Sequence, residues 1–144
     1  MNLTTKTQGI IGEAQVLAKF ESLGIPVSIP FGDNLPYDMI IDIKGKLYKI
    51  QVKTSTQSKE GKTTFEIKKN RINTQNNYIN YYNKNEVDYY ALYAINRQEF
   101  YLVPFEEAGN SSIYIRYDLP KNGQINKIKM NYDYTFEKIL NIEE

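Results

Sequence analysis

Residues 36–54 read PYDMIIDIKGKLYKIQVKT, and this stretch decides the fold that the sequence predicts. Two β-prone runs, residues 37–43 and 46–54, flank the dipeptide Lys44-Gly45, which favours a tight turn. The stretch therefore predicts an antiparallel β-hairpin with a two-residue turn.

A turn of that length fixes which side chains share a face of the hairpin. If residue 43 faces residue 46, Asp38 lies opposite Gln51, and Lys53 follows two positions further along the same face. The other face is apolar throughout and consists of Tyr37, Met39 and Ile41 against Tyr48, Ile50 and Val52. A three-residue loop would reverse this parity unless a bulge restored it. With the two-residue turn, one face packs on the core and the other presents an acid, an amide and an amine.

A helix is expected before the hairpin, over residues 7–23. Thr5 is followed three residues later by Gln8, as in a capping box, and Gly24 supplies a stop signal. Between these signals, apolar residues recur at helical spacing, namely Ile10, Ala14 and Leu17.

Glu13 stands on the apolar face of this expected helix. Burying a carboxylate is costly unless the group is paired or coordinates a metal. The flanking residues Gly9 and Gly12 would let a strand end approach the helix closely, because glycine has no side chain. We therefore expect the helix to bring Glu13 toward Asp38.

The rest of the chain predicts further strands and one more helix, with no internal repeat and no linker. The expected strands cover residues 27–30, 63–67, 87–95, 100–103 and 113–117, and a closing helix covers residues 134–142. Residues 68–86 are rich in Asn, Lys and Tyr, and a partly helical structure stays open there. This order indicates one domain over residues 1–144 of the α/β (α+β) class, with a mixed central sheet flanked by helices.

Composition mainly excludes kinds of chemistry. The chain of 144 residues is 41% hydrophobic, which is enough for a core, and it contains no Cys and no His. Cysteine nucleophiles, zinc–thiolate sites, histidine bases and Ser-His-Asp triads are therefore excluded. Catalysis would depend on carboxylates, Lys, Tyr, amides and a hard cation such as Mg²⁺. No apolar run is long enough to span a membrane and residues 1–6 show no signal peptide, so the cytoplasm is the default expectation.

Charge is unevenly distributed along the chain. The formal net charge is only +1, but residues 44–84 hold 10 basic and 2 acidic side chains. A basic stretch between acidic flanks is typical of contact with a phosphate backbone, and a solvated lysine-rich face is the alternative.

The carboxylates of Glu13 and Asp38, together with the amide of Gln51 or the backbone carbonyl of Val52, would supply oxygen ligands for Mg²⁺. Such a metal activates a bound water and offsets charge that develops on a phosphate. A lysine beside it, here Lys53, can orient the water and stabilise the transition state.

The ordered set Gly12-Glu13, Pro36-Tyr37-Asp38 and Gln51-Val52-Lys53 resembles the PD-(D/E)XK nuclease superfamily. Within it, the chain is most similar to the homing endonucleases associated with bacterial group I introns, and more distantly to archaeal Holliday-junction resolvases. The similarity covers residues 9–55 and extends more loosely through residues 87–93 and 101–104. It implies a restriction-endonuclease-like core.

By this resemblance, Asp38 is the metal-binding aspartate, Lys53 the motif lysine and Glu13 the helix glutamate that completes the metal site. Gln51 stands where most members have Asp or Glu. This departure lowers the negative charge of the site by one, so we expect weaker metal affinity or a changed number of metals. The intron-associated branch is similar in tolerating glutamine there, and activity is still expected.

The expected function is a Mg²⁺-dependent endonuclease for double-stranded DNA, with site-specific cleavage of the homing or restriction kind. Mn²⁺ is expected to substitute for Mg²⁺. Base reading would come from residues 54–69 or 68–84. Cutting both strands needs two active sites, so a homodimer or tetramer is expected. The candidate DNA-binding side chains are Lys59, Lys62, Lys68, Lys69 and Arg71. Two alternatives stay open, a Holliday-junction resolvase and a noncatalytic DNA-binding or interaction module of the same fold.

Overall fold

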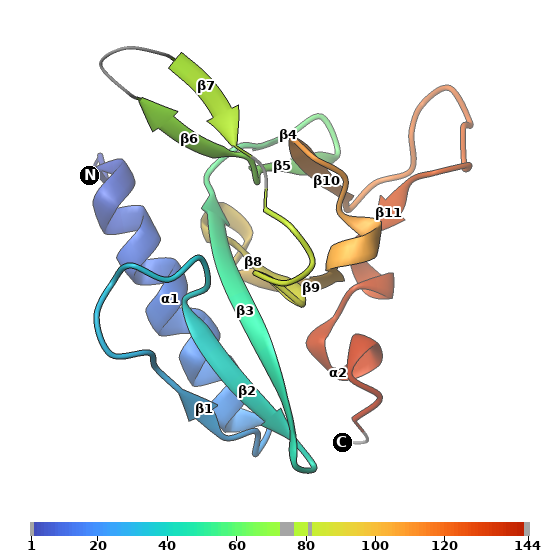
Figure 1. Ribbon diagram of the computed structural model, residues 1–144. Helices are drawn as coiled ribbons and strands as arrows, with labels where there is room; N and C mark the ends of the chain where they lie inside the picture. The colour runs from blue at the N-terminus through green and yellow to red at the C-terminus, as the bar shows by residue number, and fades with distance from the viewer. Residues whose placement is uncertain (1, 73–76, 81, 143–144) are drawn as a thin grey trace.

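The computed structural model describes residues 2–72, 77–80 and 82–142 (Figure 1). Its helices are α1 (Thr5–Ser22) and α2 (Phe136–Ile139), with three short 3-10 helices at Ile95–Arg97, Phe105–Glu107 and Asn131–Asp133. Its strands are β1 (Val27–Ser28), β2 (Met39–Ile43), β3 (Lys46–Ser55), β4 (Ser58–Lys59), β5 (Lys62–Glu66), β6 (Lys69–Ile72), β7 (Asn77–Asn80), β8 (Tyr89–Ala94), β9 (Glu99–Pro104), β10 (Ser112–Arg116) and β11 (Lys129–Met130).

The strands form a mixed five-stranded sheet and a second four-stranded sheet. The first has the order β1-β2-β3-β8-β9, in which only β3 and β8 run parallel, and the second has the order β11-β10-β5-β4. Strands β6 and β7 pair with each other in a hairpin that stands at the top of the view in Figure 1. The expected α+β fold with a mixed central sheet is confirmed, whereas the second sheet was not predicted.

Two apolar clusters lie on opposite faces of the five-stranded sheet. On one face, Val16 and Phe20 of α1 pack on the apolar side of the β2–β3 hairpin. On the other face, Phe65 of β5 and Ile113 of β10 pack on β8 and β9. Strand β8 contributes to both clusters and is buried on both faces, which explains its continuous apolar sequence YYALYA.

The β2–β3 hairpin has the predicted register. Ile43 pairs with Lys46 and Met39 pairs with Ile50. Lys44 and Gly45 both have positive φ, 52° and 91°, which is the conformation of the two-residue turn that fits the twist of a hairpin. The turn therefore sets the parity that separates the apolar face from the polar face.

Helix α1 begins two residues earlier than expected and buries a different stripe. Its N-cap is Thr4, whose side chain accepts a hydrogen bond from the backbone N of Thr7 at 3.1 Å, so the Thr5–Gln8 capping box is wrong. The buried stripe is Gly12, Val16 and Phe20. The face expected to be buried is instead rotated toward solvent, and Ile10 on that face is 58% exposed.

Two other expectations need correction. The described part of residues 68–86 contains strands β6 and β7 and no helix. The closing helix is only the four residues of α2, because the backbone O of Tyr134 accepts a hydrogen bond from Leu102 of β9 at 2.8 Å and Thr135 caps the helix just after it. Among the described residues, no helix has the length and apolar character to cross a membrane.

Candidate active site

Asp38 lies at the point where β3 continues beyond the end of β2. The last β2–β3 pair is Met39 with Ile50, and the backbone N of Asp38 donates to the O of Ile50 at 2.8 Å. Further along β3, the backbone N–H of Val52 has no β2 residue opposite it, and it donates instead to Oδ2 of Asp38 at 2.8 Å. The hydrogen-bonding requirement of the free strand edge therefore fixes the orientation of the carboxylate.

Gly12 allows α1 to approach β3 closely enough to deliver Glu13. A Cβ atom on Gly12 would lie 1.8 Å from Oγ1 and 3.1 Å from Cβ of Thr54, so no larger residue fits without a shift. The prediction of close approach is confirmed at Gly12 and wrong at Gly9, where a Cβ would meet nothing within 4 Å.

Glu13 and Asp38 line the same cavity and lie close enough for their carboxyl groups to interact, as expected. Partial burial, the hydrogen bond to Asp38 and the negative charge of Asp38 raise the pKa of Glu13 to about 7. Two neighbouring carboxylates resist simultaneous ionisation, so Glu13 keeps its proton to a higher pH than an isolated glutamate does. A divalent cation between them would relieve the same repulsion.

Val52 and Gln51 complete a set of oxygen donors at this edge. The N–H and C=O groups of one strand residue point to the same side, so the carbonyl of Val52 points to the edge where Asp38 binds its N–H. The side-chain amide N of Gln51 donates to this carbonyl at a long distance of 3.4 Å. The carboxylate of Asp38, the amide of Gln51 and the carbonyl of Val52 therefore lie along the edge of β3 that faces the start of β2.

Lys53 lies beyond this set and contacts a residue that the sequence did not single out. Its Nζ donates to the hydroxyl O of Tyr82 at 3.2 Å and lies 5.0 Å from the centre of the Tyr82 ring. Burial, followed by the charges of Asp38 and Glu86, raises the pKa of Tyr82 to about 12, so the hydroxyl keeps its proton. Tyr82 belongs to a tyrosine-rich segment without clear periodicity, and no sequence signal distinguishes it from its neighbours.

A cavity of about 460 Å³ opens beside the two carboxylates. Glu13, Asp33 and Asp38 are its acidic lining residues, and α1 together with the loop before β2 forms its apolar part. The apolar lining includes Ile10, Ala14, Leu17, Ile29, Pro30 and Leu35. The exposed residues Ile10 and Ala14 of α1 therefore line this cavity, and Leu17 contacts both the cavity and the core.

The donor set fits a hard cation such as Mg²⁺. Glu13, Asp38, Gln51 and the carbonyl of Val52 offer only oxygen ligands, which Mg²⁺ prefers. No cluster of three or more acidic side chains suited to a metal occurs in the described part of the chain. Any cation here would thus be held by two carboxylates, with neutral oxygens and water filling the remaining positions.

The five basic side chains expected to bind DNA differ in what they contact. Lys62 lies over the ring of Tyr114, 4.7 Å from its centre, and Lys68 forms an ion pair with Glu66 at 3.2 Å. Lys59 is exposed on β4. Lys69 and Arg71 belong to β6, but their side chains lie outside the described residues, as does much of the base-reading segment expected over residues 68–84.

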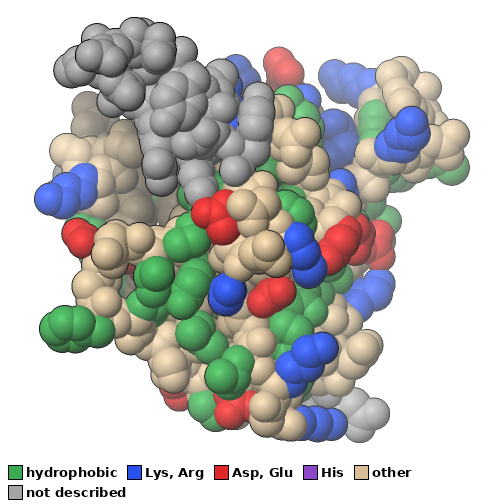
Figure 2. Space-filling view, in the orientation of Figure 1, with side chains coloured by type: hydrophobic (Ala, Val, Ile, Leu, Met, Phe, Trp, Pro, Cys, Tyr) green, Lys and Arg blue, Asp and Glu red, His purple; other side chains and the backbone are tan. Residues whose placement is uncertain are grey.

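The structure brings basic residues from the last third of the chain next to Lys62. Lys62 and Arg116 face each other across the β5–β10 pair, and both line a cavity of about 220 Å³ with Lys127 and Lys129. We call these four residues the outer basic surface. Among the described residues, none of the four forms an ion pair. Figure 2 shows Lys and Arg side chains gathered at the upper right, where Figure 1 places β10 and β11.

A family model described as PD-(D/E)XK endonuclease matches residues 3–137. A solved structure described as a bacterial homing endonuclease, I-Ssp6803I, is similar with a TM-score of 0.79 and 26% sequence identity over 97% of this chain and 94% of that chain. A comparison with curated proteins gave no match.

Proposed function

Because the chain belongs to the PD-(D/E)XK endonuclease family, we propose that it is a Mg²⁺-dependent endonuclease that hydrolyses phosphodiester bonds in double-stranded DNA at specific sites. The observation that carries this proposal is the contact between the carboxyl groups of Glu13 and Asp38, on the strand edge that leads to Lys53. The similarity to a homing endonuclease supports the site-specific form.

In this proposal, each residue of the strand edge has its own role. Glu13 and Asp38 hold the cation, and the carbonyl of Val52 and the amide of Gln51 supply neutral oxygen ligands. A bound Mg²⁺ lowers the pKa of water and offsets charge on the scissile phosphate, and Mn²⁺ would substitute for it. The ammonium group of Lys53 orients the attacking water and stabilises the negative charge that develops on the phosphate oxygens.

We propose that the DNA backbone follows the basic side chains of the second sheet. Lys62 and Arg116 are like charges directly opposite each other, an arrangement that destabilises a sheet. A polyanion would compensate this charge, and its phosphates would displace counterions from the outer basic surface. We propose that the same DNA backbone also contacts four further basic residues near β4 and β6, namely Lys59, Lys68, Lys69 and Arg71.

A homodimer or tetramer is part of the proposal, since cutting both strands of a duplex requires two active sites. Sedimentation of the purified protein with and without DNA measures this directly. A protein that stays monomeric on DNA would nick one strand only.

Incubation of the purified protein with plasmid, plain duplex and four-way junction in Mg²⁺ tests the function. We expect cleavage of the plasmid and duplex, its loss in Asp38→Asn, and only a slow residual cleavage in Lys53→Ala. Asp133→Asn and Lys138→Ala are matched controls, because these two side chains form an ion pair at 2.9 Å near α2. Cleavage of the four-way junction alone would favour a resolvase, and DNA binding without cleavage would favour the noncatalytic module.

A further inference from the structure

We propose that Tyr82 is a positioning residue for Lys53, whose ammonium group it holds beside the two carboxylates through the phenolic oxygen. This inference rests on the proposed function, because it assigns Tyr82 a role in the same reaction. It adds a residue from outside the three motif segments.

The contact between the two side chains combines a hydrogen bond with a cation–π contact. The ammonium group of Lys53 donates to the hydroxyl O of Tyr82 at 3.2 Å and approaches the ring face at 5.0 Å from its centre. A lysine carries its charge on a flexible four-carbon stem, so its position is not fixed by the backbone alone. Two simultaneous interactions with one aromatic side chain restrict that stem to a narrow range of positions.

The ring of Tyr82 packs against the apolar cluster formed by β5, β8, β9 and β10. It packs edge-on against Tyr90 with ring centres 5.9 Å apart, and Tyr90 stacks on Phe105 at 6.3 Å. Tyr90 is almost fully buried in β8, the strand that pairs with β3. The position of the Tyr82 ring therefore depends on a buried residue of β8, the strand that pairs with the strand of Lys53.

The turn that follows Tyr82 is closed by its own polar groups. The backbone O of Asn83 accepts from the N of Glu86 at 2.9 Å, and Oδ1 of Asn83 accepts from the N of Asn85 at 3.0 Å. The carboxylate of Glu86 accepts in return from the N of Asn83 at 3.1 Å.

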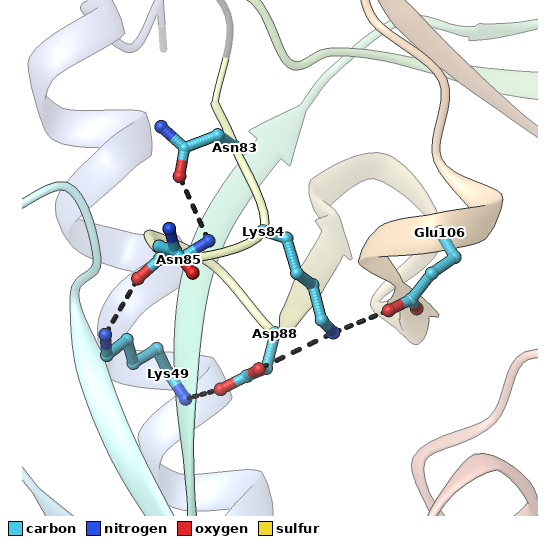
Figure 3. A network of polar contacts seen from close by, with 6 residues as sticks. All are labelled: Lys49, Asn83, Lys84, Asn85, Asp88 and Glu106. Atoms are coloured by element: carbon cyan, nitrogen blue, oxygen red, sulfur yellow. Dashed lines mark hydrogen bonds and ion pairs between the residues drawn. The ribbon is translucent and has the colours of Figure 1, made fainter.

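Polar contacts join this turn to β3 and to the 3-10 helix at Phe105–Glu107 (Figure 3). Nζ of Lys49 donates to the backbone O of Asn85 at 2.8 Å, and the backbone N of Lys49 donates to Asp88 at 2.8 Å. Lys84 forms ion pairs with both Asp88 and Glu106. The polar network thus anchors the residues after Tyr82 to the start of β3, and Lys53 lies further along that same strand.

The test compares single-turnover cleavage rates, at saturating protein and in Mg²⁺, of the wild type and Tyr82→Phe. This variant keeps the ring and loses only the hydroxyl, so the fold is retained. We expect the rate of the cleavage step to fall about 10- to 100-fold, as for a misplaced catalytic group, while the Kd for DNA measured in Ca²⁺ stays within about twofold. Tyr134→Phe is the matched control, because it removes a hydroxyl that donates to Glu107 at 2.7 Å away from the site, and its rate should match the wild type.

A double-mutant cycle separates positioning from a general structural role. If Tyr82 acts through Lys53, Tyr82→Phe should not slow the residual cleavage by Lys53→Ala any further. A merely structural tyrosine would slow the two backgrounds by the same factor. The same four proteins, unfolded by urea without metal, should show coupling between the two substitutions, which reads the contact independently of activity.

The outcomes also separate this inference from the function on which it rests. A wild type that cuts no DNA overturns both. A wild type that cuts, with a Tyr82→Phe variant that cuts at the same rate or with multiplicative effects in the cycle, overturns the positioning role alone.

Discussion

The carboxylate of Asp38 accepts a hydrogen bond from the backbone N–H of Val52, 2.8 Å away and one residue before Lys53. Beyond the last backbone pair of β2 and β3, a side chain therefore joins the residue before β2 to the edge of β3. A register shift of β3 would move Val52 and Lys53 together relative to Asp38, so this bond couples the geometry of the acid to that of the lysine.

Glycine at position 12 should be required for the position of Glu13. Gly12→Ala places a Cβ against Thr54, and such overpacking costs about 1–3 kcal/mol in the free energy of unfolding. Gly9→Ala is the matched control on the same helix, with open space at its Cβ, and it should be stabilising by about 0.5–1 kcal/mol through helix propensity. Urea unfolding of both variants measures these changes. Equal effects at the two positions would contradict the close approach.

The raised pKa of Glu13 should make the metal-free protein less stable as pH rises. The folded chain holds the proton up to a pKa of about 7, whereas the ordinary value is 4.5, so unfolding releases protons between these values. The contribution to stability is complete below pH 4.5 and lost as pH rises through 7. Urea unfolding at pH 5 and pH 8 should show this decline, and Glu13→Gln should remove it. Glu21→Gln, on the same helix, is the control, and an unchanged decline in Glu13→Gln would refute the carboxyl contact.

Binding of Mg²⁺ should stabilise the protein without any DNA. A ligand at about ten times its Kd adds about 1.4 kcal/mol to the free energy of unfolding. We expect a higher Tm in Mg²⁺ for the wild type and no change for Asp38→Asn. Asp42→Asn is a suitable control, because Asp42 accepts a hydrogen bond from Gly45 at the far end of the hairpin. A Tm that responds equally in both variants would place the metal elsewhere.

Gln51→Glu should strengthen metal binding, because it restores a third negative charge to the donor set. Isothermal titration with Mn²⁺ should give a Kd lower by about tenfold, which corresponds to about 1.4 kcal/mol. Gln57→Glu, an exposed position beyond the end of β3, controls for the change in net charge. A Kd unchanged by Gln51→Glu would remove residue 51 from the metal site.

The outer basic surface should dominate the salt dependence of DNA binding. Each phosphate contact contributes about 0.9 to the slope of log K against log salt concentration, so Lys62→Ala and Lys129→Ala together should lower the slope by about 2. Lys46→Ala is the control, because Lys46 is exposed beside the turn at the other end of the hairpin. If the slope falls equally in the control, the surface has no special role.

Much of the candidate site was predictable from local sequence. The dipeptide Lys44-Gly45 adopts two positive φ angles, which fixed the register and hence the separation of apolar and polar faces. Gly12 marked the close approach of the helix correctly, because the absence of a side chain permits such an approach. Gly9 carried the same signal without the contact, since a glycine shows where approach is allowed and not where it occurs.

What the sequence by itself determined is the ordered set of an acid on a helix, an acid at a strand start and a lysine on the next strand, together with the exclusion of histidine and cysteine chemistry. The tertiary structure decided which groups those residues meet. Tyr82 reaches Lys53 because β8 pairs with β3 and a turn before β8 is fastened to Lys49, and Arg116 faces Lys62 because β10 pairs with β5. These contacts join residues 29 and 54 positions apart in the chain. Such pairings depend on how whole sheets pack, and the periodicity of a single segment carries no information about them.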